Sequence, residues 1–481
     1  MPINTLEPQP LWTHFCDLNA IPRASKNERK AIEFVKKFGD ELRLETLVDR
    51  VGNVIIKKPA SPGMEDRPVV ALQGHLDMVH QKNAGTTFDF DTEGIRMGRD
   101  GDWVRAEGTT LGADNGIGVA AIMAVLASKS LRHPPLEALF TIDEETGMSG
   151  AKGFQAGLLS ARYLLNLDTE DDRELTIGCA GGVDVLGSGR CETVPTPPDH
   201  RPMKVVIQGL TGGHSGTDIH LGRANANKLM NRLLYIAAER FGVRVSSIDG
   251  GGLRNAIPRE STAVVAVPAG AVEGFRAFVA EEQSRFQSEY QTTDPGLTCQ
   301  TEDAGAAPRV LEPRHQERLL QALYALPHGI YRMSPDVPGL VQTSNNLARV
   351  LVRDGELSVQ CLSRGSLDSE RDDQATAVAC ALKLLGVQVE LAGDYPGWAP
   401  KPESAIVKLM TDLYRRVFGE EPHVNACHAG LECGILGKNY PDMEMISFGP
   451  NIRGAHSPDE TVQVSSVQKF WRLLTATLEG L

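Results

Sequence analysis

Residues 69–77 read Val-Val-Ala-Leu-Gln-Gly-His-Leu-Asp, a short apolar run that ends in two side chains able to bind a metal ion. The run has the length and composition of a buried strand. His75 and Asp77 are two positions apart, so on extended backbone they lie on the same face. A metal-binding imidazole needs a partner for its second nitrogen, and Asp77 is close enough to orient His75 in that way.

Two further apolar runs end in acidic side chains. Residues 136–142 precede the pair Glu144 and Glu145, and residues 163–167 precede Asp168. In open α/β sheets, binding sites collect beyond the carboxyl ends of the strands. Three strand ends that all carry candidate ligands therefore predict a shared metal site, although a lone aspartate after a strand is usually a turn residue.

The Glu144–Glu145 pair follows a third acid, Asp143. Three negative charges at one strand end cost free energy unless a cation is present. Adjacent side chains point in different directions, so one glutamate can bind a metal ion while the other faces the attacking water. One of the two is then the general base, and residue chemistry alone leaves the choice open.

Asp114 lies in a glycine-rich turn, residues 112–118, that leads into a helix. The ordinary interpretation is an N-cap aspartate; the alternative is a carboxylate that bridges two ions in an open loop of small residues. His456 lies far downstream in Gly-Ala-His-Ser-Pro. Two imidazoles with these carboxylates suit two divalent ions, which predicts a metallohydrolase.

Short strands that alternate with helices predict an α/β domain with a mostly parallel, mixed sheet. The pattern changes near residue 183 and resumes near residue 396. In between, two strand–loop–helix units (residues 204–241, with His214, and 356–385, with Arg364) suggest an inserted α+β domain of two similar halves. We therefore expect a discontinuous catalytic domain, residues 1–182 and 396–481, and an insertion at 183–395, bounded by proline-rich linkers at 191–202 and 394–402.

Composition narrows the class of protein. The chain has 481 residues, 41% hydrophobic and 23% charged, with a net charge of −13, which argues against nucleic acid or an anionic membrane as partner. No apolar stretch reaches the length of a membrane span, and the first residues show no secretory signal. The eight cysteines form no CxxC pair, as expected for reduced thiols in the cytoplasm.

Taken in order, these motifs resemble the co-catalytic metallopeptidase family that includes aminoacylases, succinyl-diaminopimelate desuccinylases and several dipeptidases. Within the family, the closer resemblance is to bacterial aminoacyl-histidine dipeptidases, cytosolic enzymes that cleave β-alanyl-histidine (carnosine) and related Xaa-His dipeptides. The large insertion and three motifs carry this closer resemblance: Leu-Thr-Gly-Gly-His-Ser-Gly (210–216), Asn-Ala-Cys-His-Ala-Gly-Leu-Glu-Cys-Gly (425–434) and Gly-Pro-Asn-Ile-Arg-Gly-Ala-His-Ser-Pro (449–458).

The resemblance implies a role for each metal-site residue. His75 and Asp168 would hold one ion and Glu145 and His456 the other, with Asp114 as the bridge. Asp77 would orient His75, and Glu144 would be the general base. The resemblance also implies a cis peptide bond between Asp114 and Asn115. The two ions are expected to be Zn²⁺, with Mn²⁺ or Co²⁺ as alternatives.

The resemblance also assigns the inserted domain, as a lid, to substrate binding. His214 matches the histidine that polarises the scissile carbonyl, supplied in short-lid members by the partner subunit, so both origins stay open here. Arg364 suits a clamp for the substrate's terminal carboxylate, and Asn255 matches a lid asparagine near the substrate. We expect a cytoplasmic, homodimeric Xaa-His dipeptidase. The rivals are an N-acyl amino acid deacylase or tripeptidase of the same family and a non-catalytic peptide-binding protein.

Overall fold

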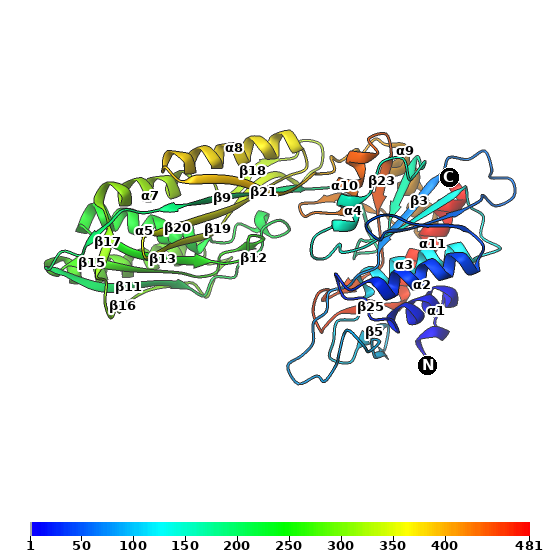
Figure 1. Cartoon of the computed structure of the whole chain (residues 1–481), viewed down its shortest axis with the longest axis horizontal. Coiled ribbons are helices and arrows are strands. Elements are labelled where there is room, and N and C mark those ends of the chain that lie inside the picture. Colours follow the sequence, from blue (N-terminus) through cyan, green and yellow to red (C-terminus); the bar gives the residue numbers. More distant parts are fainter. Residues whose placement is uncertain (1) are drawn as a thin grey trace. The chain divides into compact units, whose positions relative to one another are not determined.

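The computed structural model describes residues 2–481 (Figure 1). Its contacts divide the chain into two units: unit 1 comprises Met1–Cys179, Trp398–Ala426 and Leu431–Leu481, and unit 2 comprises Ala180–Gly397 and Cys427–Gly430. No helix among residues 2–481 is long and apolar enough to cross a membrane.

Unit 1 contains a mixed sheet in the order β1-β2-β6-β3-β7-β23-β8-β22. Strand β3 lies between β6 and β7 and runs parallel to both, and β7 runs parallel to β23. Every residue of β3, β6 and β7 is buried, as expected for central strands covered on both faces. The strand bounds are β1 Glu45–Val48, β2 Val54–Lys58, β3 Val70–His75, β6 Leu136–Thr141, β7 Tyr163–Asn166, β8 Glu174–Cys179, β22 His423–Cys427 and β23 Glu444–Ser447.

Helix α3 (Ala113–Ala127) occupies the core of unit 1. Nearly every residue of α3 is buried, so the helix is covered on all sides rather than on one face. The reason is composition: Ala and Gly between the large apolar residues let neighbours approach from every side. The other helices of unit 1 are α1 Gln9–Asn19, α2 Arg29–Glu41, α4 Ser149–Gly153, α9 Ala405–Phe418, α10 Glu432–Asn439 and α11 Val464–Gly480.

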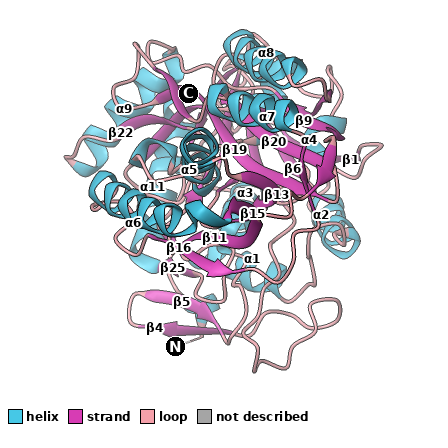
Figure 2. Ribbon diagram, turned by 90° about the vertical axis from the view of Figure 1, so that its left-hand side faces the viewer, coloured by secondary structure: helices cyan, strands magenta, loops and turns pink. Residues whose placement is uncertain are grey.

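A smaller sheet in unit 1 carries the loop with His456. Its order is β24-β25-β5-β4, and the β4–β5 hairpin is visible in Figure 2. Residues 454–460 connect β24 to β25. These two strands pair with each other, and β25 also pairs with β5, so both ends of the loop are fixed in the sheet. The bounds are β4 Met97–Asp100, β5 Trp103–Ala106, β24 Ile452–Arg453 and β25 Thr461–Gln463.

Unit 2 is built on an antiparallel sheet in the order β16-β11-β15-β13-β19-β20-β9-β21, with β18 also paired to β19. Helices α5, α6, α7 and α8 belong to this unit, and its apolar core is separate from that of unit 1. The helix bounds are α5 Ala226–Phe241, α6 Val272–Glu289, α7 Pro313–Ala325 and α8 Asp368–Leu384. The strand bounds are β9 Gly181–Arg190, β11 His200–Gln208, β13 Arg244–Gly251, β15 Ser261–Pro268, β16 Thr298–Asp303, β18 Gly329–Met333, β19 Val341–Arg353, β20 Glu356–Gly365 and β21 Gln388–Tyr395.

Three details differ from the sequence analysis. The segment 191–202 is no linker, because β10 (Thr193–Pro195) pairs with β17 (Arg309–Leu311) and β11 starts at His200. Arg364 lies within strand β20 rather than in a loop. Cys427–Gly430 groups with unit 2, where the N–H of Ala180 donates to the carbonyl oxygens of Cys427 at 3.2 Å and Ala429 at 2.9 Å.

Candidate metal centre

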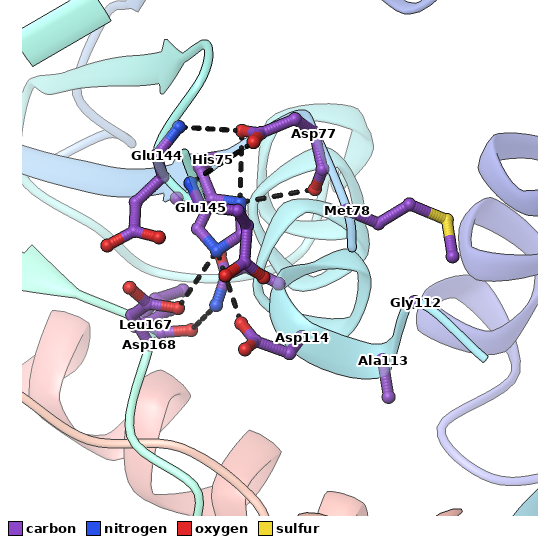
Figure 3. A network of polar contacts seen from close by, with 12 residues as sticks. His75, Asp77, Met78, Gly112, Ala113, Asp114, Glu144, Glu145, Leu167 and Asp168 are labelled. Carbon is purple, nitrogen blue, oxygen red and sulfur yellow. Dashed lines mark hydrogen bonds and ion pairs between the residues drawn. The ribbon is translucent and has the colours of Figure 1, made fainter. Parts of the chain in front are cut away.

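The three strand ends of the sequence analysis meet at one edge of the unit 1 sheet. His75 is the last residue of β3, Glu144 and Glu145 follow β6, and Asp168 follows β7. Because β3 is parallel to both neighbours, these carboxyl ends point the same way. Figure 3 shows the Asp114 and Asp168 carboxylates directed at the ring of His75.

Asp114 faces a different histidine with each of its carboxylate oxygens. His75 Nε2 is 3.1 Å from Asp114 Oδ1 and 3.4 Å from Asp168 Oδ1. His456 Nε2 is 3.3 Å from Asp114 Oδ2 and 3.0 Å from Glu145 Oε2. The tertiary structure therefore brings together residues that are far apart in the chain, and Asp114 lies between the two histidines.

Three overlapping groups of side chains in the described part of the chain could each hold a metal ion. Within each group, the ligand atoms lie within 4.8 Å of one another. The groups are His75, Asp114 and Asp168; Asp114, Glu145 and His456; and His75, Glu144 and Glu145. In the third group Glu144 is itself a candidate ligand, so this geometry leaves its role open.

The backbone at Asp114 departs from the helix that it starts. Asp114 and Asn115 have non-helical φ/ψ values inside α3, and the peptide bond between them is cis, as the family resemblance implied. The Asn115 side chain donates to the carbonyl oxygen of Leu167. A Cβ at Gly118 would overlap both groups, so this close approach requires glycine.

Asp77 is fully buried, and both its carboxylate oxygens accept hydrogen bonds. Oδ1 accepts the N–H of Glu144 at 3.0 Å, and Oδ2 accepts the N–H of Glu145 at 3.3 Å and the hydroxyl of Ser25 at 2.8 Å. His75 Nδ1 lies 3.3 Å from Oδ1 and 3.2 Å from the backbone oxygen of Asp77. Asp77 thus presents two oxygens to Nδ1 of the imidazole and also holds the Glu144–Glu145 backbone.

The electrostatics of the site favour a cation. Burial and the neighbouring carboxylates raise the pKa of Glu144 well above its ordinary value, and burial raises that of Asp168 to about 6. Hydrogen bonds to Asp114 and Glu145 raise the pKa of His456 to about 11. Burial alone would lower the pKa of His75, but Asp168, Asp114 and Asp77 outweigh it and raise the pKa. The carboxylates outnumber the imidazoles, which suits a divalent cation.

One atom of the cluster supports the same conclusion. Glu145 Oε1 is buried and has no hydrogen-bond partner among the described residues. An unpaired buried carboxylate oxygen is costly unless a cation binds it. The donor set of imidazole nitrogens and carboxylate oxygens therefore fits one or two divalent ions of the zinc, manganese or cobalt type.

Sequence reasoning missed a buried polar chain beneath the strand ends. Glu432, the first residue of α10, accepts hydrogen bonds from Gln73 at 2.7 Å and Thr141 at 2.6 Å, and Asn166 donates to the side-chain oxygen of Gln73. Burial raises the pKa of Glu432 to about 8. The signal in the sequence was a polar residue near the end of each of three mostly apolar strands: Gln73 in β3, Thr141 in β6 and Asn166 in β7. The buried residues Glu460 and Arg23 were missed as well.

The three predicted substrate-binding residues lie in unit 2. Arg364 is only 4% exposed. Its guanidinium donates to Tyr395 Oη at 2.7 Å and to Ser215 Oγ at 3.4 Å, and lies 3.5 Å from His214 Nε2. Asn255 is exposed, and its backbone carbonyl oxygen accepts the N–H of Ser215 at 2.7 Å. These three contacts of the Arg364 guanidinium are all with neutral groups.

The protonation of His214 follows from its contacts. Its Nδ1 accepts the backbone N–H groups of Gly216 at 3.2 Å and Thr217 at 3.1 Å. A nitrogen that accepts carries no proton, so the proton of the neutral ring is on Nε2. Burial and the charge of Arg364 lower the pKa of His214 to about 4, which keeps the ring neutral near pH 7. His214 Nε2 and the Arg364 guanidinium are thus two neighbouring donors suited to a shared oxygen acceptor.

Comparison with known proteins finds relatives that span the whole chain. Residues 71–480 match the model of peptidase family M20/M25/M40. The chain is 41% identical to the cytosol non-specific dipeptidase of Escherichia coli strain K12, over 100% of this chain and 99% of that protein. It is 42% identical to the crystal structure of aminoacylhistidine dipeptidase from Vibrio alginolyticus, with a TM-score of 0.93, covering 100% of this chain and 98% of that one.

A more distant structure shares the fold alone: a tripeptidase from Staphylococcus aureus is 14% identical, with a TM-score of 0.57 over 98% of both chains. The family match covers both parts of unit 1 that carry the strand-end cluster and His456, and the E. coli and Vibrio relatives span the full chain. On this evidence the chain belongs to peptidase family M20/M25/M40 and is a hydrolase that acts on peptide bonds.

Proposed function

We propose that the chain is a metal-dependent dipeptidase with two divalent ions. The observation that carries the proposal is the position of Asp114, whose two carboxylate oxygens lie 3.1 Å from His75 and 3.3 Å from His456. A carboxylate between two imidazoles, each with a further acid beside it, is the arrangement that a bridged pair of ions requires. The family match and the names of the full-length relatives support the peptidase reaction.

The proposed ligands form two sets. His75 and Asp168 would hold one ion, Glu145 and His456 would hold the other, and Asp114 would offer one carboxylate oxygen to each set. Zn²⁺ is the first expectation because imidazoles and carboxylates are both among its ligands, and Mn²⁺ or Co²⁺ suits the same set. Asp77 orients the imidazole of His75 through Nδ1, which directs Nε2 at the ion.

Glu144 is the proposed general base. Bound divalent ions would lower the pKa of the attacking water and polarise the scissile carbonyl. Glu144 accepts a proton from that water and passes it to the amine of the leaving amino acid. Two features suit this role: the pKa of Glu144 is raised by burial, and the hydrogen bond from its N–H to Asp77 holds the backbone in place.

Unit 2 supplies the proposed substrate contacts. The neutral His214 donates from Nε2 to the carbonyl oxygen of the scissile bond. Arg364, buried among neutral partners, pairs with the terminal carboxylate of the dipeptide. Asn255 binds the substrate beside His214. Its backbone carbonyl oxygen accepts the N–H of Ser215, the residue after His214. A free carboxylate one residue beyond the scissile bond is the chemistry that separates dipeptides from longer peptides.

Three further proposals concern the preferred substrate, the location in the cell and the oligomeric state. Xaa-His dipeptides such as β-alanyl-histidine are the proposed substrates, and the name of the Vibrio relative supports this. We further propose that the chain acts in the cytoplasm as a homodimer, without a nucleic acid or membrane partner; the name of the E. coli relative supports the location.

The test is a substrate panel on purified protein of known metal content. β-Alanyl-histidine, unblocked dipeptides without histidine, tripeptides and acetyl amino acids are assayed with and without a chelator. The proposal expects chelator-sensitive cleavage of dipeptides, restored by Zn²⁺, Mn²⁺ or Co²⁺, and fastest with a carboxyl-terminal histidine. Faster cleavage of acetyl amino acids or tripeptides would refute the dipeptide assignment. Absence of metal-dependent hydrolysis would refute the enzyme assignment.

A further inference from the structure

Glu460 lies four positions after His456, and its side chain is 2% exposed. Its carboxylate accepts four consecutive backbone N–H groups that lead to the bridging aspartate. Oε2 accepts those of Leu111 at 2.7 Å and Gly112 at 2.9 Å, and Oε1 accepts those of Ala113 at 2.7 Å and Asp114 at 3.2 Å. The first N–H groups of a helix have no partner within the helix, and a negative charge is favoured there.

Both oxygens of Glu460 are used by these four hydrogen bonds, so the carboxylate faces the backbone rather than the cluster of candidate ligands. A cap on a helix would need one or two such bonds. Four bonds to consecutive residues hold the whole turn of residues 111–114, including the backbone of Asp114 itself. Glu460 also belongs to the loop of residues 454–460 that carries His456.

The opposite side of the same turn is held by Arg23, which is 1% exposed. Its guanidinium donates to the carbonyl oxygen of Gly112 at 2.5 Å and to those of Leu76 at 3.1 Å and Asp77 at 3.0 Å. Gly112 has a φ of +71°, and a Cβ there would lie 2.5 Å from Arg23 Nη2. The turn therefore has little freedom to move without Glu460 or Arg23 moving too.

From this geometry we propose that Glu460 is a positioning residue for the metal centre: it holds Asp114 and His456 at the separation that the ion between them needs. The inference rests on the proposed two-ion site. One carboxylate links the two chain segments, residues 111–114 and 454–460, that supply these ligands. Removing its acceptor oxygens frees Asp114 to move away from His456, so the ion held by Glu145 and His456 is bound less tightly.

The test compares Glu460→Gln with a matched control. Glutamine keeps the size of the side chain but replaces one acceptor oxygen with a donor that faces two N–H groups. Glu137 is the control because it is also buried (4% exposed) and accepts backbone N–H groups, from Ser160 at 2.8 Å and Ala161 at 3.1 Å. It lies near the start of β6, at the end of the sheet remote from the cluster.

Metal-free full-length protein is titrated with Zn²⁺ by calorimetry, and the unfolding of each metal-free variant by urea is recorded. We expect Glu460→Gln to weaken the second equivalent of Zn²⁺ by about 10–100-fold, the usual cost of losing a partner of a metal ligand. Glu137→Gln should bind both equivalents as the wild type does, although it also lowers stability. Glu460→Asp keeps the charge and should recover part of the lost affinity. It replaces Glu460→Gln in the titration if that variant does not fold.

Two results would overturn this inference and leave the two-ion proposal intact. In one, Glu460→Gln binds both equivalents of Zn²⁺ as tightly as the wild type does. In the other, Glu137→Gln loses as much affinity for Zn²⁺ as Glu460→Gln does. The first shows that the turn needs no such support, and the second shows that general destabilisation explains the loss. A wild type that binds fewer than two equivalents overturns the proposed two-ion site, and this inference with it.

Discussion

The backbone N–H of Glu144 donates to Oδ1 of Asp77 at 3.0 Å. The same oxygen lies 3.3 Å from His75 Nδ1. The Asp77 carboxylate therefore connects the end of β3 to the segment after β6, so that a shift of His75 or of the Glu144 backbone would affect the other.

Asp77→Asn should weaken metal binding and lower kcat by about 10–100-fold each. The amide replaces one acceptor oxygen with a donor, so either the Glu144 N–H or the Glu145 N–H loses its partner. The measurements are a zinc titration and steady-state kinetics with a dipeptide. Ser25→Ala is the control, because Asp77 loses only the 2.8 Å hydrogen bond to Oδ2 in that variant and keeps both backbone N–H partners. Equal losses in both variants would contradict the orienting role of Asp77.

Glu144→Gln should keep both metal ions and lose about 10²–10⁴-fold in kcat, because glutamine cannot accept the proton of the attacking water. The companion variant Glu145→Gln should instead lose affinity for one ion. Metal content is measured by elemental analysis beside kcat for each variant. If Glu144→Gln loses an ion and Glu145→Gln does not, the two roles are exchanged, as the grouping of His75 with both glutamates permits.

Arg364→Lys should raise KM for dipeptides about 10–100-fold, because an ammonium group cannot make the two parallel hydrogen bonds of a guanidinium. Dipeptides with an amidated carboxyl terminus should show little change, since they lack the proposed partner. Tyr395→Phe removes only the hydroxyl that holds Arg364 at 2.7 Å and should have a smaller effect of the same kind. A similar rise in KM for free and amidated substrates would argue against a carboxylate clamp.

His428 should make the metal-free protein less stable in acid. Burial, with the charge of Arg364, lowers its pKa to about 3, and the ring is 6% exposed with Nε2 at 2.7 Å from Ser344 Oγ. Below pH ~6.5 the unfolded chain protonates this histidine while the folded ring stays neutral. Its contribution to stability is therefore complete above that pH and is lost as the pH falls towards 3.

The measurement for His428 is urea unfolding at about pH 7 and about pH 5 in the wild type and in His428→Gln. At pH 5 the wild type should have lost on the order of 2 kcal/mol that the variant does not lose. All other histidines are common to both proteins, so the difference isolates His428. Equal pH dependence in the two proteins would show that His428 accepts a proton in the folded state.

Much of unit 1 could be predicted from local sequence. The apolar runs before His75, Glu144 and Asp168 form β3, β6 and β7, in that order, because continuous burial is required of central parallel strands. The helix after Asp114 was also expected, but not its burial on every side, because a small-residue pattern does not show how many neighbours will pack against it. The segment 191–202 was misread as a linker because prolines and polar residues also occur in edge strands.

The amino-acid sequence by itself determined the set of candidate ligands at the strand ends, since residue type and hydrophobic periodicity indicate which side chains follow which buried strands. Only the tertiary structure decided that Asp114 lies between His75 and His456, that Asp77 holds the Glu144–Glu145 backbone, and that Glu460 accepts the N–H groups of residues 111–114. These contacts join segments separated by up to 349 positions. Periodicity describes neighbours along one element, whereas such contacts depend on the order of strands in the sheet and on how loops pack at its edge.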